Sequence, residues 1–219
     1  MQSSMGKHGA FKPAPGAQSQ SKPGLESLMV EPSESTKLEG LHGFAEYAGS
    51  RKLKGKKALI TGGEYGTVNI LVNNASKQYL YKEFENTDLD KTEDIFRTNI
   101  IQMIAMAKFA LPHMTRGDSI INTSSVVTFR GSGTMIDYAA TKGAIIGFTR
   151  SLATHLLPKG IRVNAVATGM VYTPIQVDTR DPQEMEGWGR KAGLGRPGEP
   201  GEVATSFVFL ASADASLYC

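Results

Sequence analysis

The sequence predicts an α/β fold with a parallel sheet, because short apolar runs alternate along the chain with longer segments of helical periodicity. The apolar runs are rich in β-branched residues and bounded by turn residues, which is typical of buried strands. They lie at residues 58–61, 68–72, 119–122 and 161–166. Helices are expected over residues 90–114, 138–157 and 202–211.

The long helices carry recognisable end signals. Apolar residues recur at helical spacing through residues 90–114, and Pro112 falls in the last turn of that segment. The helix expected over residues 138–157 is followed by Pro158 and Gly160, which favour a helix end.

Two segments have the composition of irregular structure, the first 50 residues and residues 168–198. Residues 1–50 are rich in Ser, Pro, Gly, Gln and Lys and show no sustained period, so we expect a disordered or extended tail. The folded domain is expected to occupy residues 51–219. Within it, residues 168–198 contain repeated Gly and Pro and are predicted to be rich in loops.

Composition excludes several classes of protein. The formal net charge of +3 comes from residues 1–56, and a mild excess in a tail does not predict nucleic-acid binding, which needs Lys and Arg clustered on a folded face. No apolar run approaches the ~20 residues that span a bilayer, and the N-terminus lacks the apolar region of a secretory signal. Cys219 is the single cysteine, which fits a reducing compartment and a cytoplasmic location. The histidines show no metal-ligand spacing, so no metal is expected.

Tyr138 and Lys142 carry the first chemical signal. Residues i and i+4 share one face of a helix. A tyrosine hydroxyl is a poor acid–base group at neutral pH because its reference pKa is ~10. A nearby cation favours the phenolate and lowers that pKa, so Tyr138 beside Lys142 can exchange a proton with a carbonyl or an alcohol. Taken alone, the pair is equally compatible with a surface contact on a helix.

Ser125 and Asn99 strengthen this interpretation by their positions. Ser125 follows the strand expected over residues 119–122, where a hydroxyl can bind the same substrate oxygen. Turn chemistry after a strand is the alternative for this serine. Asn99 lies inside the helix expected over residues 90–114, although Asn is a mediocre helix former. It is either a satisfied polar core residue or a group that holds a water in a proton path.

Together these residues resemble the short-chain dehydrogenase/reductase family, in particular its subgroup with an N-terminal extension that includes glucose and ribitol dehydrogenase homologues. The resemblance covers about residues 57–217 and rests on the order and spacing of five motifs. They are Asn73-Asn-Ala-Ser76, Asn99, Ser125, Tyr138-x-x-x-Lys142 and Asn164-Ala-Val-Ala-Thr-Gly169.

The resemblance implies a role for each catalytic position. Tyr138 is expected to be the general acid/base. Lys142 would lower its pKa and bind the nicotinamide ribose, and Ser125 would orient the substrate oxygen. Asn99 would anchor a water in the proton relay.

The implied cofactor is NADP or NAD, between which the sequence does not distinguish. The substrate would be a small carbonyl compound, an alcohol or a sugar. In this family, the helices matching residues 90–114 and 138–157 pack against a partner subunit, so a dimer or tetramer is expected. Besides Tyr138 and Lys142, the residues expected to bind the cofactor are Gly62, Gly66, Asn73, Ala75, Gly169, Val171 and Thr173.

The implied fold is a Rossmann-like, doubly wound parallel sheet, but the sequence predicts an incomplete one. Residues 61–66 keep the first part of the family's glycine motif, whereas Thr67 and Val68 replace its last Ile-Gly. The helix that should follow is absent. The family's last strand would begin where the chain stops. We therefore expect an internal deletion in the first βαβ half and a C-terminal truncation.

The predicted deletion changes the expected path of the chain. Parallel neighbouring strands need a crossover of about a dozen residues or more. Residues 62–66 suit a hairpin instead, which would make the strand at 68–72 antiparallel to its neighbour and would misplace Asn73.

Two functional hypotheses follow. The first is an NAD(P)-dependent oxidoreductase that interconverts a hydroxyl and a carbonyl, supported by the intact catalytic set. The second is a catalytically dead remnant of the family that keeps at most an oligomerisation surface, supported by the broken glycine motif. Binding of NADPH or NADH would discriminate between them.

Overall fold

The computed structural model describes residues 16–22, 24–40, 43–59, 67–190 and 192–219. The chain divides into two compact units. We call Arg51–Thr168 with Ser206–Cys219 the sheet unit, and Met1–Ser50 with Gly169–Thr205 the loop unit. Each unit is described by itself.

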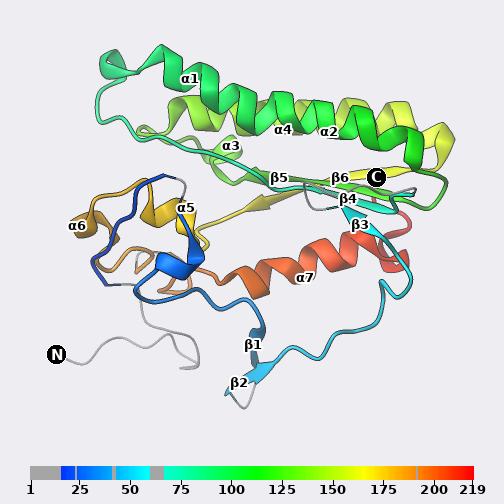
Figure 1. Cartoon of the computed structure of the whole chain (residues 1–219), viewed down its shortest axis with the longest axis horizontal. Helices are drawn as coiled ribbons and strands as arrows, with labels where there is room; N and C mark the ends of the chain where they lie inside the picture. Colours follow the sequence, from blue (N-terminus) through cyan, green and yellow to red (C-terminus); the bar gives the residue numbers. More distant parts are fainter. Residues whose placement is uncertain (1–15, 23, 41–42, 60–66, 191) are drawn as a thin grey trace. The chain divides into compact units, whose positions relative to one another are not determined.

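The sheet unit is built on four parallel strands in the order β3-β4-β5-β6. The sheet confirms the predicted α/β class and corresponds to a partial Rossmann-like sheet (Figure 1). β5 and β6 are longer than the sequence pattern indicated, because the polar run after Asn122 continues to pair with β6. The strands are β3 (Ala58–Leu59), β4 (Ile70–Asn73), β5 (Ser119–Ser125) and β6 (Arg162–Thr168).

The prediction of a hairpin between the first two strands is wrong. Ala58 pairs with Ile70 and Leu59 with Leu71 in a parallel ladder. Parallel pairing is possible because β4 begins at Ile70 rather than at Val68, which leaves residues 60–69 for the connection. The parallel arrangement also places Leu59 in the apolar cluster that contains Leu71. Most of the connection, residues 60–66, lies outside the described residues.

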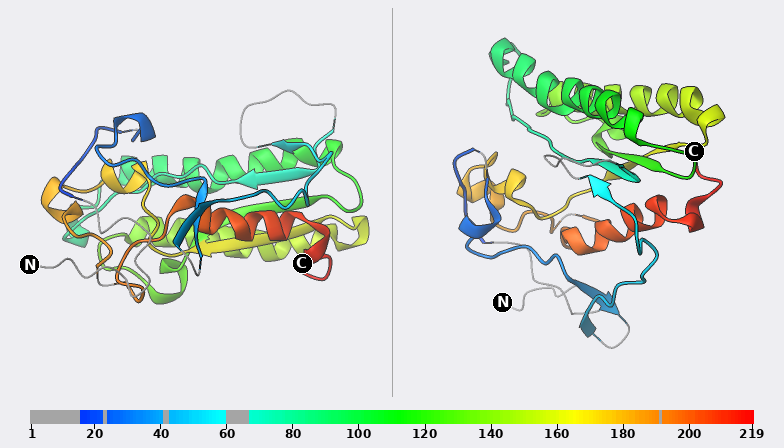
Figure 2. Two further views of the ribbon diagram at one scale, coloured as in Figure 1. Left: turned by 90° about the horizontal axis from the view of Figure 1, so that it is seen from below. Right: turned by 45° about the vertical axis from the view of Figure 1, so that its right-hand side comes forward.

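One face of the sheet is covered by two long helical segments (Figures 1 and 2). The first begins with α1 (Leu89–Phe96), which Asp88 caps by accepting hydrogen bonds from two backbone N–H groups. It continues through a π-helical turn (Arg97–Ile101) into α2 (Gln102–Ala110) and a 3₁₀ turn (Leu111–His113) that contains Pro112.

The second segment is α4 (Ile136–Leu156), which follows the short α3 (Val127–Arg130). A 3₁₀ turn (Leu157–Lys159) then ends at Gly160. Gly160 has a φ of 67°, a left-handed conformation that glycine adopts without strain. The predicted helix end at Pro158 and Gly160 is therefore confirmed.

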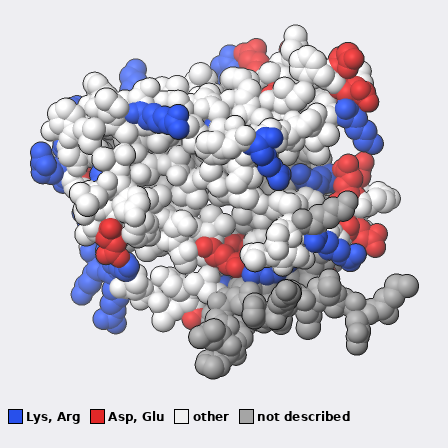
Figure 3. Space-filling view, turned by 180° about the vertical axis from the view of Figure 1, so that it is seen from behind, with Lys and Arg blue, Asp and Glu red and all other residues white. Residues whose placement is uncertain are grey.

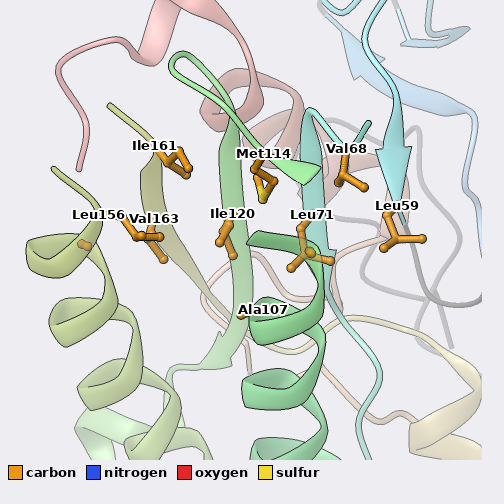
Figure 4. Packing of buried hydrophobic residues seen from close by; sticks show 11 residues of the cluster. Leu59, Val68, Leu71, Ala107, Met114, Ile120, Leu156, Ile161 and Val163 are labelled. Atoms are coloured by element: carbon orange, nitrogen blue, oxygen red, sulfur yellow. The ribbon is translucent and has the colours of Figure 1, made fainter. Parts of the chain in front are cut away.

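The core of the sheet unit lies between the strands and these helices. Leu59, Leu71, Ile120 and Val163 form a row across the four strands, each from a different strand (Figure 4). Ala107 and Leu156 pack against the row from the helices. Because burial of such side chains is worth ~1.5–3 kcal/mol each, this row fixes the register of the sheet.

The opposite face of the sheet is covered by the C-terminal part of α7 (Pro200–Ala211). Phe207, Leu210 and Ala211 pack with Ile70 and Ile121 of the sheet. A 3₁₀ turn (Ala213–Ala215) follows. Helices thus cover both faces of the sheet, as a doubly wound fold requires.

The loop unit differs from the prediction for residues 1–50. A 3₁₀ turn (Glu26–Leu28) is followed by the antiparallel strands β1 (Lys37–Gly40) and β2 (Gly43–Glu46). Part of the predicted tail is therefore folded. Residues 1–15 lie outside the described residues, and a separate tail domain stays a prediction.

Burial of one side chain explains why this part of the tail is ordered. Met29 is buried in an apolar cluster with Tyr172, Val177 and Met185. The cluster joins the tail segment to the loop-rich segment that contains α5 (Pro174–Val177) and α6 (Pro182–Met185). The sequence did not predict this contact, because the short apolar run Leu28-Met29-Val30 shows no sustained period.

Lys and Arg residues are interspersed with Asp and Glu on the face drawn in Figure 3. None of the helices that the structure describes is long and apolar enough to cross a membrane. In the same part of the chain, no group of three His, Cys, Asp or Glu side chains comes together in a way that could hold a metal ion.

Candidate active site

The candidate site lies where β5 ends and α4 begins, both in the sheet unit. Lys142 and Tyr138 lie one turn apart on α4, and the Lys142 Nζ atom is 5.4 Å from the centre of the Tyr138 ring. Lys142 is only 1% exposed, whereas Tyr138 is half-buried. The sequence prediction that these two side chains share one face is confirmed. A surface contact is excluded, because the lysine is inside the protein.

The end of the β4–β5 ladder holds the Lys142 ammonium. The last pair of this ladder is Asn73 with Asn122. The carbonyl of Thr123 lies one residue past that pair and accepts a hydrogen bond from Lys142 Nζ at 2.9 Å. The ammonium thus takes the place of the backbone N–H that a longer β4 would offer to this carbonyl. It is fixed at the carboxyl ends of the strands.

Burial lowers the pKa of Lys142 to about 8 from the 10.5 of an exposed lysine. The cause is desolvation, which disfavours the charged form of an amine. At pH 7 the side chain still carries its proton. A buried positive charge therefore lies beside the Tyr138 ring.

Two serines at the end of β5 bond to the helices that follow, Ser124 to α4 and Ser125 to α3. The Ser124 hydroxyl donates to the backbone carbonyl of Lys142 at 3.0 Å. Ser125 is buried, and its Oγ accepts a hydrogen bond from the N–H of Val127 at 3.4 Å. That bond uses an acceptor position of Ser125 and not its O–H donor. Turn chemistry and a role toward a ligand are therefore compatible for this serine.

Asn99 connects the helical layer to the loop after β4. Its Oδ1 accepts hydrogen bonds from Ser76 Oγ at 3.1 Å and from the N–H of Lys77 at 2.8 Å. Its Nδ2 donates to the carbonyl of Lys77 at 2.9 Å and to Thr141 Oγ1 at 3.1 Å. The side chain is thus satisfied by protein groups alone, which is the first of the two alternatives that the sequence left open.

Asn99 also lies in the π-helical turn that interrupts the first long helix. Turns of this kind shift the backbone hydrogen bonds of a helix and occur frequently at functional sites. Because four protein groups already bond the Asn99 side chain, a water in a proton path would need other polar groups to hold it. In the sequence, the only indication of this π-helical turn was an asparagine, a mediocre helix former, in the middle of a predicted helix.

Asn73 uses its side chain within the fold. Its Nδ2 donates to Asn122 Oδ1 at 2.8 Å, and Asn122 Nδ2 donates to Thr149 Oγ1 at 2.9 Å. This buried chain of hydrogen bonds ties β4 and β5 to α4. Ala75, by contrast, is exposed beyond the end of β4. Sequence reasoning missed Asn122 and Thr149, although an asparagine inside an apolar strand was a usable signal.

The other predicted cofactor residues belong to the loop unit or lie outside the described residues. Gly62 and Gly66 lie outside the described residues. Gly169, Val171 and Thr173 belong to the loop unit, where Val171 forms an isolated bridge with Gly198.

Asp137 is a further residue of this region that the sequence did not single out. Its Oδ1 accepts a hydrogen bond from the N–H of Tyr138 at 2.7 Å, whereas its buried Oδ2 has no partner among the described residues. Burial and then the negative charge of Asp137 raise the pKa of Tyr81. The carboxylate thus fixes the backbone where Tyr138 begins its turn of α4.

Comparisons with known proteins show to which family the chain belongs. A family model described as enoyl-(acyl carrier protein) reductase matches residues 58–218. The chain belongs to the short-chain dehydrogenase/reductase family. The resemblance found from the five sequence motifs is therefore confirmed.

Curated relatives in the family share nearly half of the aligned residues. The chain is 46% identical over 154 residues to a glucose and ribitol dehydrogenase of Daucus carota. It is 44% identical over 154 residues to a chloroplastic NADPH-dependent aldehyde reductase of Arabidopsis thaliana. Each alignment covers 70% of this chain, and 53% and 54% of the relatives. The chain thus spans about half the length of the curated relatives it matches.

Solved structures of the family share the fold. Aldohexose dehydrogenase of Thermoplasma acidophilum superposes with a TM-score of 0.63 at 34% identity, covering 70% of this chain and 64% of that one. The structure of BdcA in complex with NADPH superposes with a TM-score of 0.63 at 29% identity, covering 69% and 62% of the two chains.

Proposed function

We propose that this chain is an NAD(P)-dependent oxidoreductase that interconverts an alcohol or sugar hydroxyl and a carbonyl. The observation that carries the proposal is the buried ammonium of Lys142, held 5.4 Å from the ring centre of Tyr138 at the carboxyl end of β5. Ligands of open α/β sheets bind outside the carboxyl ends of the strands. The neighbouring cation favours the ionised form of Tyr138, which suits proton exchange.

The roles assigned to the residues follow from these positions. In alcohol oxidation, Tyr138 accepts the hydroxyl proton, and in carbonyl reduction it returns that proton to the oxygen. Ser125 donates its O–H to the same oxygen and holds it in place. Lys142 keeps the local charge positive. A nicotinamide cofactor, when bound, takes up or supplies the hydride.

The donor set of the site fits the nicotinamide ribose. An ammonium group has three N–H donors, and one of them binds the Thr123 carbonyl. The other two can bind ribose hydroxyls, and Tyr138 can bind a third group from the same helix face. We propose Ala75, the backbone of Asn73, Gly169, Val171 and Thr173 as further cofactor contacts, with Gly62 and Gly66 facing the diphosphate.

The relatives support a nicotinamide cofactor and a small polar substrate. The Arabidopsis relative is named as NADPH-dependent, and the carrot relative is named for glucose and ribitol. We propose a carbonyl compound or a polyol of similar size as the substrate and either NADP or NAD as the cofactor. A cytoplasmic location is proposed from the single cysteine of the chain.

A homo-oligomer is proposed through the outer face of α2 and the π-helical turn before it. Ile101, Ile104 and Phe109 expose 56%, 42% and 68% of their surface there. Clustered exposed apolar side chains of this kind mark interaction surfaces. We propose neither a nucleic acid nor a membrane as partner.

The second candidate function is a catalytically dead remnant of the family. It is favoured by the segment after the first strand, because Thr67 and Val68 replace the last Ile-Gly of the family's glycine motif. In a complete nucleotide-binding fold, the turn after this strand carries the glycines that receive the diphosphate. A remnant would keep the core of the sheet unit but would not turn over substrate.

Turnover of NADPH and NADH separates the two candidates. The wild-type protein should oxidise either cofactor in the presence of an aldehyde, a ketone or an aldose. Tyr138→Phe should lose turnover by ~10²–10⁴-fold, because it removes a general acid, while its cofactor binding stays close to wild type. An inactive wild-type protein, or an active Phe variant, would contradict the proposed chemistry.

A further inference from the structure

Within the loop unit, residues 16–22 and 24–34, here called the tail segment, bond to the loop-rich segment near both of its ends. Near the first end, Gln20 donates its N–H to the carbonyl of Val177 at 3.0 Å. Just past the second end, Glu199 Oε2 accepts a hydrogen bond from the N–H of Glu34 at 2.7 Å. The tail segment therefore ties the two ends of the loop-rich segment to one another.

Tyr172 is the residue of the loop-rich segment that the tail segment holds most closely. Its side chain is buried, and its ring clusters with Met29. Its hydroxyl accepts a hydrogen bond from Gln18 Nε2 and donates to the carbonyl of Glu31 at 2.8 Å. Burial raises the pKa of Tyr172 to about 12, so the hydroxyl keeps the proton that it donates. The tail segment thus supplies both polar partners of this side chain and one of its apolar neighbours.

Asp178 fixes the tail segment to the end of α5. Its Oδ2 accepts a hydrogen bond from the N–H of Gly24 at 2.8 Å. Its Oδ1 pairs with Lys22 Nζ at 3.0 Å. The Asp178 side chain is only 7% exposed, so both bonds are largely shielded from water. Each oxygen of one buried carboxylate is therefore bonded from the tail segment.

Gly24 shows how closely the tail segment approaches α5. A Cβ atom at this position would overlap the carbonyl oxygen of Pro174 and would lie 2.9 Å from its carbonyl carbon. Backbone atoms cannot yield as the end of a flexible side chain can, so only glycine fits without a shift of one segment. At Gly49 the same atom would meet nothing within 4 Å. A single methyl group at Gly24 should therefore separate the two segments.

We propose that the tail segment is a positioning element for the cofactor-binding part of the loop unit, and that it acts through Tyr172. This residue lies between Val171 and Thr173, two of the proposed cofactor contacts. Val171 forms a parallel bridge with Gly198, and Thr173 has an extended backbone. Because successive side chains of an extended chain point to opposite sides, Tyr172 faces the tail segment while its two neighbours face away from it.

The expected consequence concerns cofactor affinity. The apparent affinity of a ligand falls with the fraction of protein that is in the binding-competent conformation. Release of the tail segment would let residues 171–173 leave that conformation, and a fall of the competent fraction to a tenth would raise the Kd ~10-fold. Tyr138 and Lys142 belong to the sheet unit, so kcat at saturating cofactor should stay close to wild type. This consequence rests on the proposed function, whereas the positioning itself does not.

Hydrogen exchange tests the positioning without any assay of activity. Amide exchange is measured by mass spectrometry on the wild type and on Gly24→Ala, with Gly49→Ala as the matched control. Peptides that cover residues 171–178 should exchange several-fold faster in Gly24→Ala and as in the wild type in Gly49→Ala. Peptides of β5 should not change, which shows that the variants are folded. Tyr172→Phe keeps the ring, loses both hydroxyl bonds and should act in the same direction. Unchanged exchange of residues 171–178 in both Gly24→Ala and Tyr172→Phe would overturn the inference.

Cofactor titration tests the consequence. Met29 is 7% exposed and Leu28 is 64% exposed, so Leu28→Ala is the matched control for Met29→Ala. Met29→Ala should raise the Kd and the KM for NADPH ~10-fold with kcat retained, and the volume-conserving Met29→Leu should restore both. A Kd that stays at the wild-type value while exchange of residues 171–178 rises contradicts a role of the tail segment in cofactor binding. A wild-type chain that binds no cofactor contradicts the proposed function instead, and exchange then still decides whether the tail segment holds Tyr172.

Discussion

The two sides of the parallel sheet differ in the interactions that the structure describes for them. On the β5 side, seven-residue strands pair along their whole length, and buried polar bonds tie β5 to α4. On the β3 side, the described pairs are Ala58 with Ile70 and Leu59 with Leu71, and residues 60–66 lie outside the described residues. The comparison shows that the geometry around Tyr138 and Lys142 depends on β4, β5 and α4. Lys142 is held by Thr123 and Ser124, both of which belong to β5.

The largest expected effect concerns the β5 side. Lys142→Met keeps the length of the side chain but removes the charge beside Tyr138 and the ribose donors. We expect turnover to fall by on the order of 10³-fold and affinity for NADPH to fall as well. Parallel assays of turnover and binding on the purified variant measure both losses. A variant that retains wild-type turnover would show that the charge is not needed.

Core truncations on the two sides compare them directly. Ile120 is fully buried in β5, whereas Leu59 is 8% exposed in β3, and both belong to one apolar cluster. Ile120→Ala should lower the free energy of unfolding by ~2–5 kcal/mol, and Leu59→Ala by clearly less, because β3 pairs with β4 alone and can relax around the cavity. Urea unfolding measures both. Equal losses would mean that β3 is as well packed as β5.

Stability should also depend on pH through Lys142. Its pKa is about 8 in the folded state and 10.5 when exposed, so between these values the unfolded chain binds the proton and the native state does not. The free energy of unfolding therefore rises with pH over this range. The buried charge costs on the order of 3 kcal/mol below pH 8 and nothing above the higher pKa.

Unfolding of the wild type and of Lys142→Met at several pH values checks this dependence. The difference between the two proteins should shift in favour of the wild type as the pH rises from about 8 to 10.5. Parallel stability curves for the two proteins would show that the lysine is not desolvated in solution.

The sequence predicted the fold class, the family and the helix ends because these depend on local patterns. Apolar runs mark strands whatever lies between them, and Pro158 and Gly160 end a helix by their own stereochemistry. The extension of β5 to Ser125 was not predictable from its polar residues, because pairing with β6 stabilises it. The parallel pairing of β3 was missed for the same reason: burial of Leu59 decides it.

The residues of the candidate site were predictable from the sequence, but their hydrogen-bond partners were not. The spacing of Tyr138 and Lys142 placed them on one helix face, as the structure confirms. The Thr123 carbonyl that holds Lys142 became available only because β4 ends at Asn73, which is a property of the whole ladder. Likewise, the saturation of Asn99 by Lys77 and Thr141 depends on contacts distant in sequence.

Cofactor binding tests the central claim most directly, namely that the β5–α4 half of the sheet unit forms a working nicotinamide site. The measurement is the thermal unfolding of the wild-type chain and of Lys142→Met with increasing NADPH and, separately, NADH. A ligand of the native state raises stability by ~2.7 kcal/mol at a hundredfold excess over Kd. We expect a cooperative transition that shifts upward for the wild type and much less for the variant. A transition that does not move with either cofactor would contradict the account.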